Sequence, residues 1–198
     1  MKHRIAIIYG TTEGQTEKIA DHMVDLFRQQ GVEATPYNIK ELPGDFSPTG
    51  YDGLIVGGSV HAGNYPKKIA RRAREWAPDL AEMPSAFYSV SLTESHDTEE
   101  ARREVSELVN TFLEETRWRP ALVASFAGAL KFSRYGFFKR KLMKNIAERA
   151  TGEAVDPRRD YEYTDWTSVD QFVEEFIRRL EGRGGQELGA EGGRPSAL

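Results

Sequence analysis

The chain of 198 residues is 39% hydrophobic and 29% charged, which suits one domain with a substantial core. Its net charge of −4 argues against a general nucleic-acid-binding domain, and the absence of cysteine excludes disulfides, metal thiolates and thiol redox chemistry. No apolar run reaches the roughly 20 residues of a membrane span and no signal peptide is recognisable, so we expect a cytoplasmic protein.

In chain order, short apolar runs alternate with longer amphipathic segments. The apolar runs predict strands at residues 5–9, 32–37, 54–56, 86–90 and 122–126. Apolar residues recur at helical spacing in residues 16–30, 66–76, 99–115 and 166–180, the last with Asp165 as its N-cap. Five strands interleaved with helices predict a doubly wound parallel sheet, with the Pro36 strand at an edge. Residues 182–198 contain six glycines and no periodicity, so we expect a domain at residues 1–181 and a disordered tail.

The first predicted strand runs directly into a loop rich in threonine and glycine. A helix follows this loop, and a helix N-terminus binds anions through its unpaired N–H groups and the positive end of its dipole. Hydroxyl donors and a glycine that lets the backbone approach an anion predict a phosphate site, the alternative being a capped turn without a ligand. The loop residues expected to take part in binding are Thr11, Thr12, Glu13, Gly14, Gln15 and Thr16. Because a carboxylate repels a phosphate, we expect the Glu13 side chain to point to solvent or to the helix N-terminus.

This loop resembles the flavodoxin pattern Ser/Thr-x-Thr-Gly-x-Thr at Thr11, Gly14 and Thr16, with Glu13 in place of the usual threonine. Further segments resemble the menaquinone-dependent protoporphyrinogen IX dehydrogenase (oxidase) branch of the flavodoxin-like family. These segments are residues 13–16, 83–90, 118–120, 127–130 and 163–166. The resemblance implies a five-stranded sheet in the order 2-1-3-4-5 and bound FMN. It also implies oxidation of protoporphyrinogen IX with a menaquinone-type acceptor, a step of haem biosynthesis, and no metal.

The same resemblance implies that the loops after the third and fourth strands flank the flavin ring. The expected contacts are Ser59, Val60, His61, Ala62 and Tyr65 in one loop, and Ser91, Leu92 and Thr93 in the other. Val60, Tyr65 and Leu92 would supply the apolar or aromatic faces that the ring needs. His61 is a candidate for proton transfer, because a neutral imidazole exchanges protons near pH 7; the alternative is a loop histidine bonded to backbone or water. No residue is obligatory for catalysis, since the flavin carries the chemistry.

A basic insert at about residues 131–150 follows the fifth strand. Its cations are Lys131, Arg134, Lys139, Arg140, Lys141, Lys144 and Arg149. They interleave with aromatic and aliphatic residues, as in interfacial amphipathic helices that dock on anionic membranes. We therefore expect contacts with substrate or membrane at Lys131, Arg134, Tyr135, Lys139, Arg140 and Lys144, and peripheral attachment to the inner face of the cell membrane. Lys131 or Arg134 could pair with porphyrinogen propionates, whereas the alternative is a helix that packs its apolar face on the domain.

Two other functions remain open from the sequence. A flavodoxin-like electron carrier would have an acidic rim and usually a tryptophan beside the flavin, but the insert is basic and neither flavin loop contains tryptophan. An NAD(P)H:quinone reductase is the second alternative, and the chain has no dinucleotide fingerprint to support it.

Overall fold

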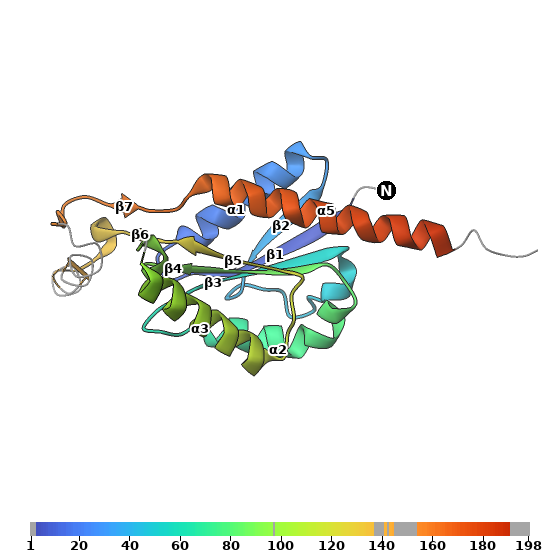
Figure 1. The fold of residues 1–198 in the computed structure, drawn as a ribbon, viewed down its shortest axis with the longest axis horizontal. Coiled ribbons are helices and arrows are strands. Elements are labelled where there is room, and N and C mark those ends of the chain that lie inside the picture. The colour runs from blue at the N-terminus through green and yellow to red at the C-terminus, as the bar shows by residue number, and fades with distance from the viewer. Residues whose placement is uncertain (1–2, 97, 137–140, 142, 145–153, 191–198) are drawn as a thin grey trace, which may run out of the picture.

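The computed structural model describes residues 3–96, 98–136, 141, 143–144 and 154–190 (Figure 1). Five parallel strands form its main sheet in the order β2-β1-β3-β4-β5. These strands are β1 (Arg4–Gly10), β2 (Glu33–Asn38), β3 (Gly53–Ser59), β4 (Ser85–Ser91) and β5 (Leu122–Ala127). The prediction of a doubly wound sheet in the order 2-1-3-4-5 is confirmed, and β2 with its Pro36 lies at an edge.

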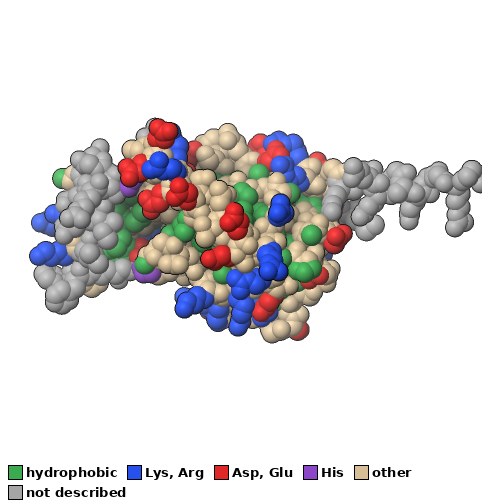
Figure 2. All heavy atoms as spheres, turned by 60° about the horizontal axis from the view of Figure 1, so that its bottom comes forward, with side chains coloured by type: hydrophobic (Ala, Val, Ile, Leu, Met, Phe, Trp, Pro, Cys, Tyr) green, Lys and Arg blue, Asp and Glu red, His purple; other side chains and the backbone are tan. Residues whose placement is uncertain are grey.

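Helices cover both faces of this sheet (Figure 1). They are α1 (Gln15–Gln29), α2 (Lys67–Ala81), α3 (Glu99–Thr116) and α5 (Trp166–Ala190), with short turns η1 (Pro48–Gly50), η2 (Thr93–Ser95) and η3 (Phe132–Arg134). Helices α1 and α5 pack on one face, and α2 and α3 on the other. Figure 2 brings the α2 and α3 face forward and shows Lys and Arg side chains gathered over it.

The strands are buried on both faces because each face carries its own core. In β1, Ile5 and Ile7 face α1 and α5, whereas Ala6 and Ile8 face α2 and α3. All four residues are 0% exposed. This burial explains why the strand is continuously apolar rather than alternating.

A glycine in β3 positions the beginning of α1. A Cβ atom on Gly57 would overlap the Tyr88 ring, so only glycine leaves room for that ring beside β3. The buried Tyr88 hydroxyl donates a hydrogen bond to the Thr16 carbonyl at 3.1 Å. The contact anchors the first turn of α1 against the sheet, and with it the end of the predicted phosphate loop.

Helix α2 continues beyond its predicted end near Trp76, through Pro78 to Ala81. A proline inside a helix removes one backbone hydrogen bond and normally ends the helix. Here Leu80 lies in the same core as Ala73 and is 1% exposed. Burial of that side chain favours the additional helical turn, so tertiary packing outweighs the local signal.

Helix α5 begins as predicted and ends later than predicted. Asp165 accepts hydrogen bonds from the Thr167 N–H at 3.0 Å and the Ser168 hydroxyl at 2.6 Å, which is the geometry of an N-cap. The helix continues past Leu180 to Ala190, into the segment that the sequence predicts to be disordered. Extension of an anchored helix needs no new nucleus, and glutamine, glutamate, leucine and alanine are good helix formers. Residues 191–198 lie outside the described part of the chain.

Candidate functional site

The predicted phosphate loop forms a tight turn at the N-terminus of α1. Gly14 has φ +93°, a backbone conformation that favours glycine, and occupies the N-cap position. Its N–H donates to the Thr11 hydroxyl at 2.8 Å, and its carbonyl accepts from the Lys18 N–H at 3.0 Å. The loop therefore combines a left-handed glycine, threonine hydroxyls and the positive end of a helix dipole, which together suit an anion.

Buried polar atoms at this edge lack hydrogen-bond partners among the described residues. They are the Thr16 Oγ1, the Gln15 Oε1 and the Ser59 Oγ atoms. Thr16 is 0% exposed and Gln15 is 4% exposed. Because a buried unpaired polar group is destabilising, a ligand that offers hydroxyls and phosphate oxygens would satisfy these atoms. Thr11 is half-buried and Thr12 is exposed beside them. The residues fit the phosphate and sugar-alcohol chain of FMN.

The loop after β3 is a hairpin turn held at both ends. His61 and Asn64 exchange two backbone hydrogen bonds, of 2.9 and 3.1 Å. Ala62 and Gly63 between them have φ values of +48° and +73°, as in turns with two left-handed residues. The Val60 N–H donates to the Val90 carbonyl at 2.8 Å, which fixes the turn to β4. The His61 side chain is exposed on this rigid turn, and its role in proton transfer stays a prediction.

Tyr65, predicted from the sequence to form a wall for the flavin ring, is packed into the core in this structure. It is 9% exposed, and its ring lies 5.3 Å from Phe87 and 4.8 Å from Phe112 between centroids. Its hydroxyl donates to the Ser89 Oγ atom at 2.8 Å, and burial raises its pKa to about 12. Gly58 makes this placement possible, because a Cβ atom there would lie 2.8 Å from the Tyr65 ring. The ring is thus part of the core under α2 and α3.

The loop after β4 packs against the segment that follows β5. The Ser91 hydroxyl accepts from the Glu94 N–H at 3.2 Å, and the Leu92 carbonyl accepts from the Ser95 N–H at 3.0 Å. The half-buried Leu92 side chain contacts a small core made of Leu130, Phe132, Tyr135 and Val155. Thr93 is also half-buried. This loop therefore lies between the main sheet and the beginning of the basic insert.

The flanks of the insert form a second, two-stranded antiparallel sheet that sequence reasoning missed. Its strands are β6 (Ala129–Leu130) and β7 (Tyr161–Glu162). The Tyr163 N–H donates to the Gly128 carbonyl at 3.1 Å and joins this small sheet to the end of β5. Strands of two residues carry no recognisable periodicity, so only the pairing reveals them.

Tyr135, predicted to contact substrate or membrane, is buried beside the phosphate loop in this structure. It is 4% exposed, and its hydroxyl donates a hydrogen bond to the Glu13 carboxylate. Burial and the neighbouring carboxylate raise the pKa of Tyr135 above its usual range. The Glu13 side chain therefore points to the insert, and not to solvent or the helix N-terminus as expected. The reason is that the Tyr135 phenol, outside the phosphate loop, offers it a hydrogen-bond donor.

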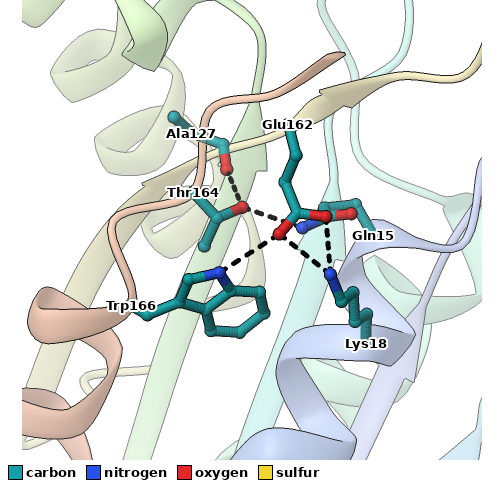
Figure 3. A network of polar contacts seen from close by, with 6 residues as sticks. All are labelled: Gln15, Lys18, Ala127, Glu162, Thr164 and Trp166. Carbon is teal, nitrogen blue, oxygen red and sulfur yellow. Dashed lines mark hydrogen bonds and ion pairs between the residues drawn. The ribbon is translucent and has the colours of Figure 1, made fainter. Parts of the chain in front are cut away.

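Figure 3 shows the polar network that fastens the same end of α1 to β7 and α5. The Gln15 side-chain amide donates to the Thr164 hydroxyl at 2.9 Å, which in turn donates to the Ala127 carbonyl at 2.7 Å. Lys18 and Glu162 form an ion pair of 2.6 Å, and the Trp166 indole donates to Glu162 at 3.1 Å. The resemblance had marked Thr164 and Trp166, but their partners lie too far along the chain to be read from the sequence.

The groups around Glu162 lower the pKa of its carboxyl. Burial opposes ionisation of this carboxyl, but the hydrogen bond and charge of Lys18 outweigh that effect and lower its pKa. The Trp166 indole and the charge of Lys131 act in the same direction. Lys131, one of the predicted substrate contacts, therefore lies in the field of this carboxylate.

The structure describes only some of the remaining residues predicted to contact substrate or membrane. Lys144 lies among the described residues and is half-buried. Lys139, Arg140 and the side chain of Arg134 lie outside the described part, as does most of the predicted amphipathic helix. Within the described residues, no group of three or more His, Asp or Glu side chains could hold a metal ion. No described helix is both long and apolar enough to cross a bilayer.

Comparison with known proteins places this geometry in a family. The flavodoxin domain family model matches residues 6–156. The chain is 32% identical over 170 residues to the protoporphyrinogen IX dehydrogenase [quinone] of Escherichia coli strain K12, covering 86% of this chain and 92% of that protein. It is 31% identical over 171 residues to the Leishmania major protein of the same name, covering 86% and 73%. Among solved structures, a short-chain flavodoxin associated with a non-canonical PDU bacterial microcompartment has a TM-score of 0.55 at 12% identity, covering 91% of this chain and 99% of that one.

Proposed function

Because the chain belongs to the flavodoxin domain family, we propose that it binds FMN at the carboxyl edge of its sheet and oxidises protoporphyrinogen IX with a quinone as acceptor. The proposed reaction rests on similarity to protoporphyrinogen IX dehydrogenases over 86% of the chain. The buried Thr16 hydroxyl at the N-terminus of α1, which has no hydrogen-bond partner within the described part of the chain, supports FMN as the cofactor. We include in the proposal a menaquinone-type acceptor, a role in haem biosynthesis and peripheral attachment to the inner face of the cell membrane.

The loop at residues 10–16 would hold the cofactor phosphate without a lysine or arginine. Charge-assisted hydrogen bonds contribute roughly 1.5–3 kcal/mol each, so several N–H and hydroxyl donors suffice. Gly14 turns the backbone so that these donors converge, and Tyr88 anchors the turn that carries them. Once bound, FMN would accept hydrogen from the porphyrinogen and pass electrons to the quinone.

The loops after β3 and β4 would bracket the flavin ring. Val60 and Leu92 are half-buried and supply apolar surface, whereas Tyr65 is turned into the core. His61 is held on a rigid turn with its side chain exposed, where an imidazole can accept a proton released from substrate. Within the described residues, Lys131 remains the candidate for pairing with a propionate, and it lies near Glu162.

Anaerobic turnover of the FMN-loaded protein tests the proposal. Protoporphyrinogen is mixed with a menaquinone analogue, and porphyrin fluorescence is followed over time. We expect porphyrin to form only when protein, FMN and quinone are all present. The same protein stripped of FMN controls for spontaneous oxidation of the porphyrinogen.

Two outcomes would replace the proposal. Reduction of quinone by NAD(P)H without turnover of porphyrinogen would indicate an NAD(P)H:quinone reductase. Electron exchange with protein partners alone, with neither substrate consumed, would indicate a flavodoxin-like carrier.

A further inference from the structure

Helix α2 carries an exposed basic surface that the proposed function does not use. Five cations occur in its first eight residues, with no acidic residue among them: Lys67, Lys68, Arg71, Arg72 and Arg74. The buried residues of α2 are Ile69, Ala73, Trp76 and Leu80, so the core-facing side of the helix is separate from the charged one. We call these five cations the α2 basic face.

Structural contacts account for Arg72, which lies over the Trp76 ring, and for Arg74, which donates to the Glu115 carbonyl, but the stability of α2 does not explain its first two cations. Lys67 and Lys68 occupy the first turn, where positive charge opposes the helix dipole. Pro66 at the N-cap makes no side-chain hydrogen bond, and the first turn contains no acidic residue. Lys67 and Arg71, like Lys68 and Arg72, are like charges four residues apart, which destabilises a helix.

Ion pairs within α2 neutralise only part of the α2 basic face. Glu75 pairs with Arg72 at 2.9 Å and lies 3.6 Å from Arg71. Lys67 and Lys68 are exposed and have no ion-pair partner among the described residues. Residues that break local rules without compensation within the fold point to a function.

The basic face begins beside the proposed flavin site. Lys67 follows Tyr65 by two residues, and the hairpin turn of residues 59–65 is fixed to β4. The first turn of α2 therefore lies at the carboxyl edge of the sheet, next to the exposed His61 turn. A surface bound to this face would lie beside the loop after β3, one of the two loops proposed to bracket the flavin ring.

The chemistry of the face fits lipid headgroups better than a protein partner. Specific protein interfaces depend on buried apolar or aromatic anchors within a polar rim. The exposed large hydrophobic residue among the described ones is Val123, which lies on β5 and outside this face. Anionic headgroups attract lysine and arginine without such an anchor.

We propose that the α2 basic face docks the protein on anionic lipid headgroups and holds the flavin loops at the bilayer surface. The inference rests on the proposed function in one respect: a quinone dissolved in the bilayer must reach the flavin. It is independent of the insert, which lies on a different element and is largely outside the described residues.

Vesicle co-sedimentation of the FMN-loaded, full-length protein tests the docking. We expect Lys67→Gln with Lys68→Gln to weaken binding to phosphatidylglycerol-containing vesicles by roughly 30-fold, from two lost attractions. The matched control is Arg28→Gln with Arg119→Gln, which removes the same charge near the amino ends of the strands. The control should bind these vesicles within a factor of about two of the unchanged protein. Vesicles of phosphatidylcholine alone should bind neither protein.

A stability measurement separates docking from a structural role of the two lysines. Lys67→Glu with Lys68→Glu places carboxylates at the positive end of the helix dipole, so its melting temperature should rise while vesicle binding falls. A lower melting temperature would show that the lysines stabilise the fold and would overturn the proposal. Unchanged vesicle binding by both lysine variants, or equal binding to neutral vesicles, would also overturn it.

The result is distinguishable from failure of the proposed function. Vesicle binding is measured without substrate, so it can be lost in the variant whether or not the protein turns over porphyrinogen. If the proposed function holds, the Lys67→Gln with Lys68→Gln variant should keep its rate with a soluble dye acceptor and slow with quinone in anionic vesicles. Equal slowing with both acceptors would contradict docking.

Discussion

Gly14 is the residue at which a left-handed backbone conformation coincides with a proposed phosphate contact. Its φ of +93° excludes an unstrained branched side chain, and we expect a Cβ there to take space that the proposed phosphate needs. We expect Gly14→Val to abolish FMN binding and to reduce stability by about 1–2 kcal/mol. Titration of flavin fluorescence gives the affinity, and riboflavin in place of FMN isolates the contribution of the phosphate.

Gly31 offers a matched control for this change. It has φ +78° near the other end of α1, and nothing lies within 4 Å of a Cβ built on it. Gly31→Val should impose similar backbone strain and leave FMN affinity unchanged. If both variants lost FMN equally, or if FMN and riboflavin bound equally well to the unchanged protein, the loop would not be the phosphate site.

At the scale of elements, the first turn of α1 and the loop before it are fastened to the chain after β5 by three side-chain contacts. Glu13 accepts from Tyr135, Gln15 donates to Thr164, and Lys18 pairs with Glu162. These contacts surround the proposed phosphate loop on the side of the insert. We therefore expect the flanks of the insert and the phosphate loop to be energetically coupled.

A double-mutant cycle measures one of these couplings. Tyr135→Phe and Glu13→Gln should each destabilise the protein, and their coupling energy should be about 1–2 kcal/mol because the bond involves a charged acceptor. Urea unfolding at neutral pH gives the free energies. Combining Tyr135→Phe with Glu17→Gln is the control, since Glu17 bonds to Tyr9 instead. A coupling near zero for the first pair would mean that the contact does not stabilise the fold.

The Lys18–Glu162 pair predicts a pH dependence of stability. The pKa of Glu162 is lowered on folding, so its contribution is present above the unfolded pKa and is lost as pH falls through the folded pKa. The stability difference between the unchanged protein and Glu162→Gln should therefore shrink between about pH 6 and pH 3. Since Lys18 is 54% exposed, this stability difference should not exceed about 1 kcal/mol. Repeating the comparison in a Lys18→Gln background should remove most of the pH dependence.

At the scale of the whole molecule, we expect the basic insert to contact an anionic membrane, as we propose for the α2 basic face. Changing Lys139, Arg140, Lys141 and Lys144 to Glu should spare folding and FMN binding, because surface charges contribute little to stability. It should reduce binding to anionic vesicles and slow turnover with bilayer quinone more than with a soluble dye. Both acceptors are measured with and without anionic lipid. Equal loss with the two acceptors would indicate that the insert is a packed helix with solvated charges.

Local sequence determined the main elements of this protein and the loop proposed to bind phosphate. Apolar runs and helical spacing located the strands of the main sheet and the helices that cover it, and the glycine and threonines before α1 predicted an anion site. The strand order came from resemblance to a family, and the sheet confirms it. These features are readable because spacing within one element is fixed by the geometry of a strand or helix.

Tertiary structure alone decided where the aromatic side chains near the site point. Tyr65 turns into the core because Gly58 leaves room for it, and Tyr135 meets Glu13 across 122 residues. Gln15 and Thr164 meet across 149 residues, and α2 passes Pro78 because Leu80 is buried. Each outcome depends on a partner brought close only when the sheet assembles, so no pattern within one segment of the sequence could specify it.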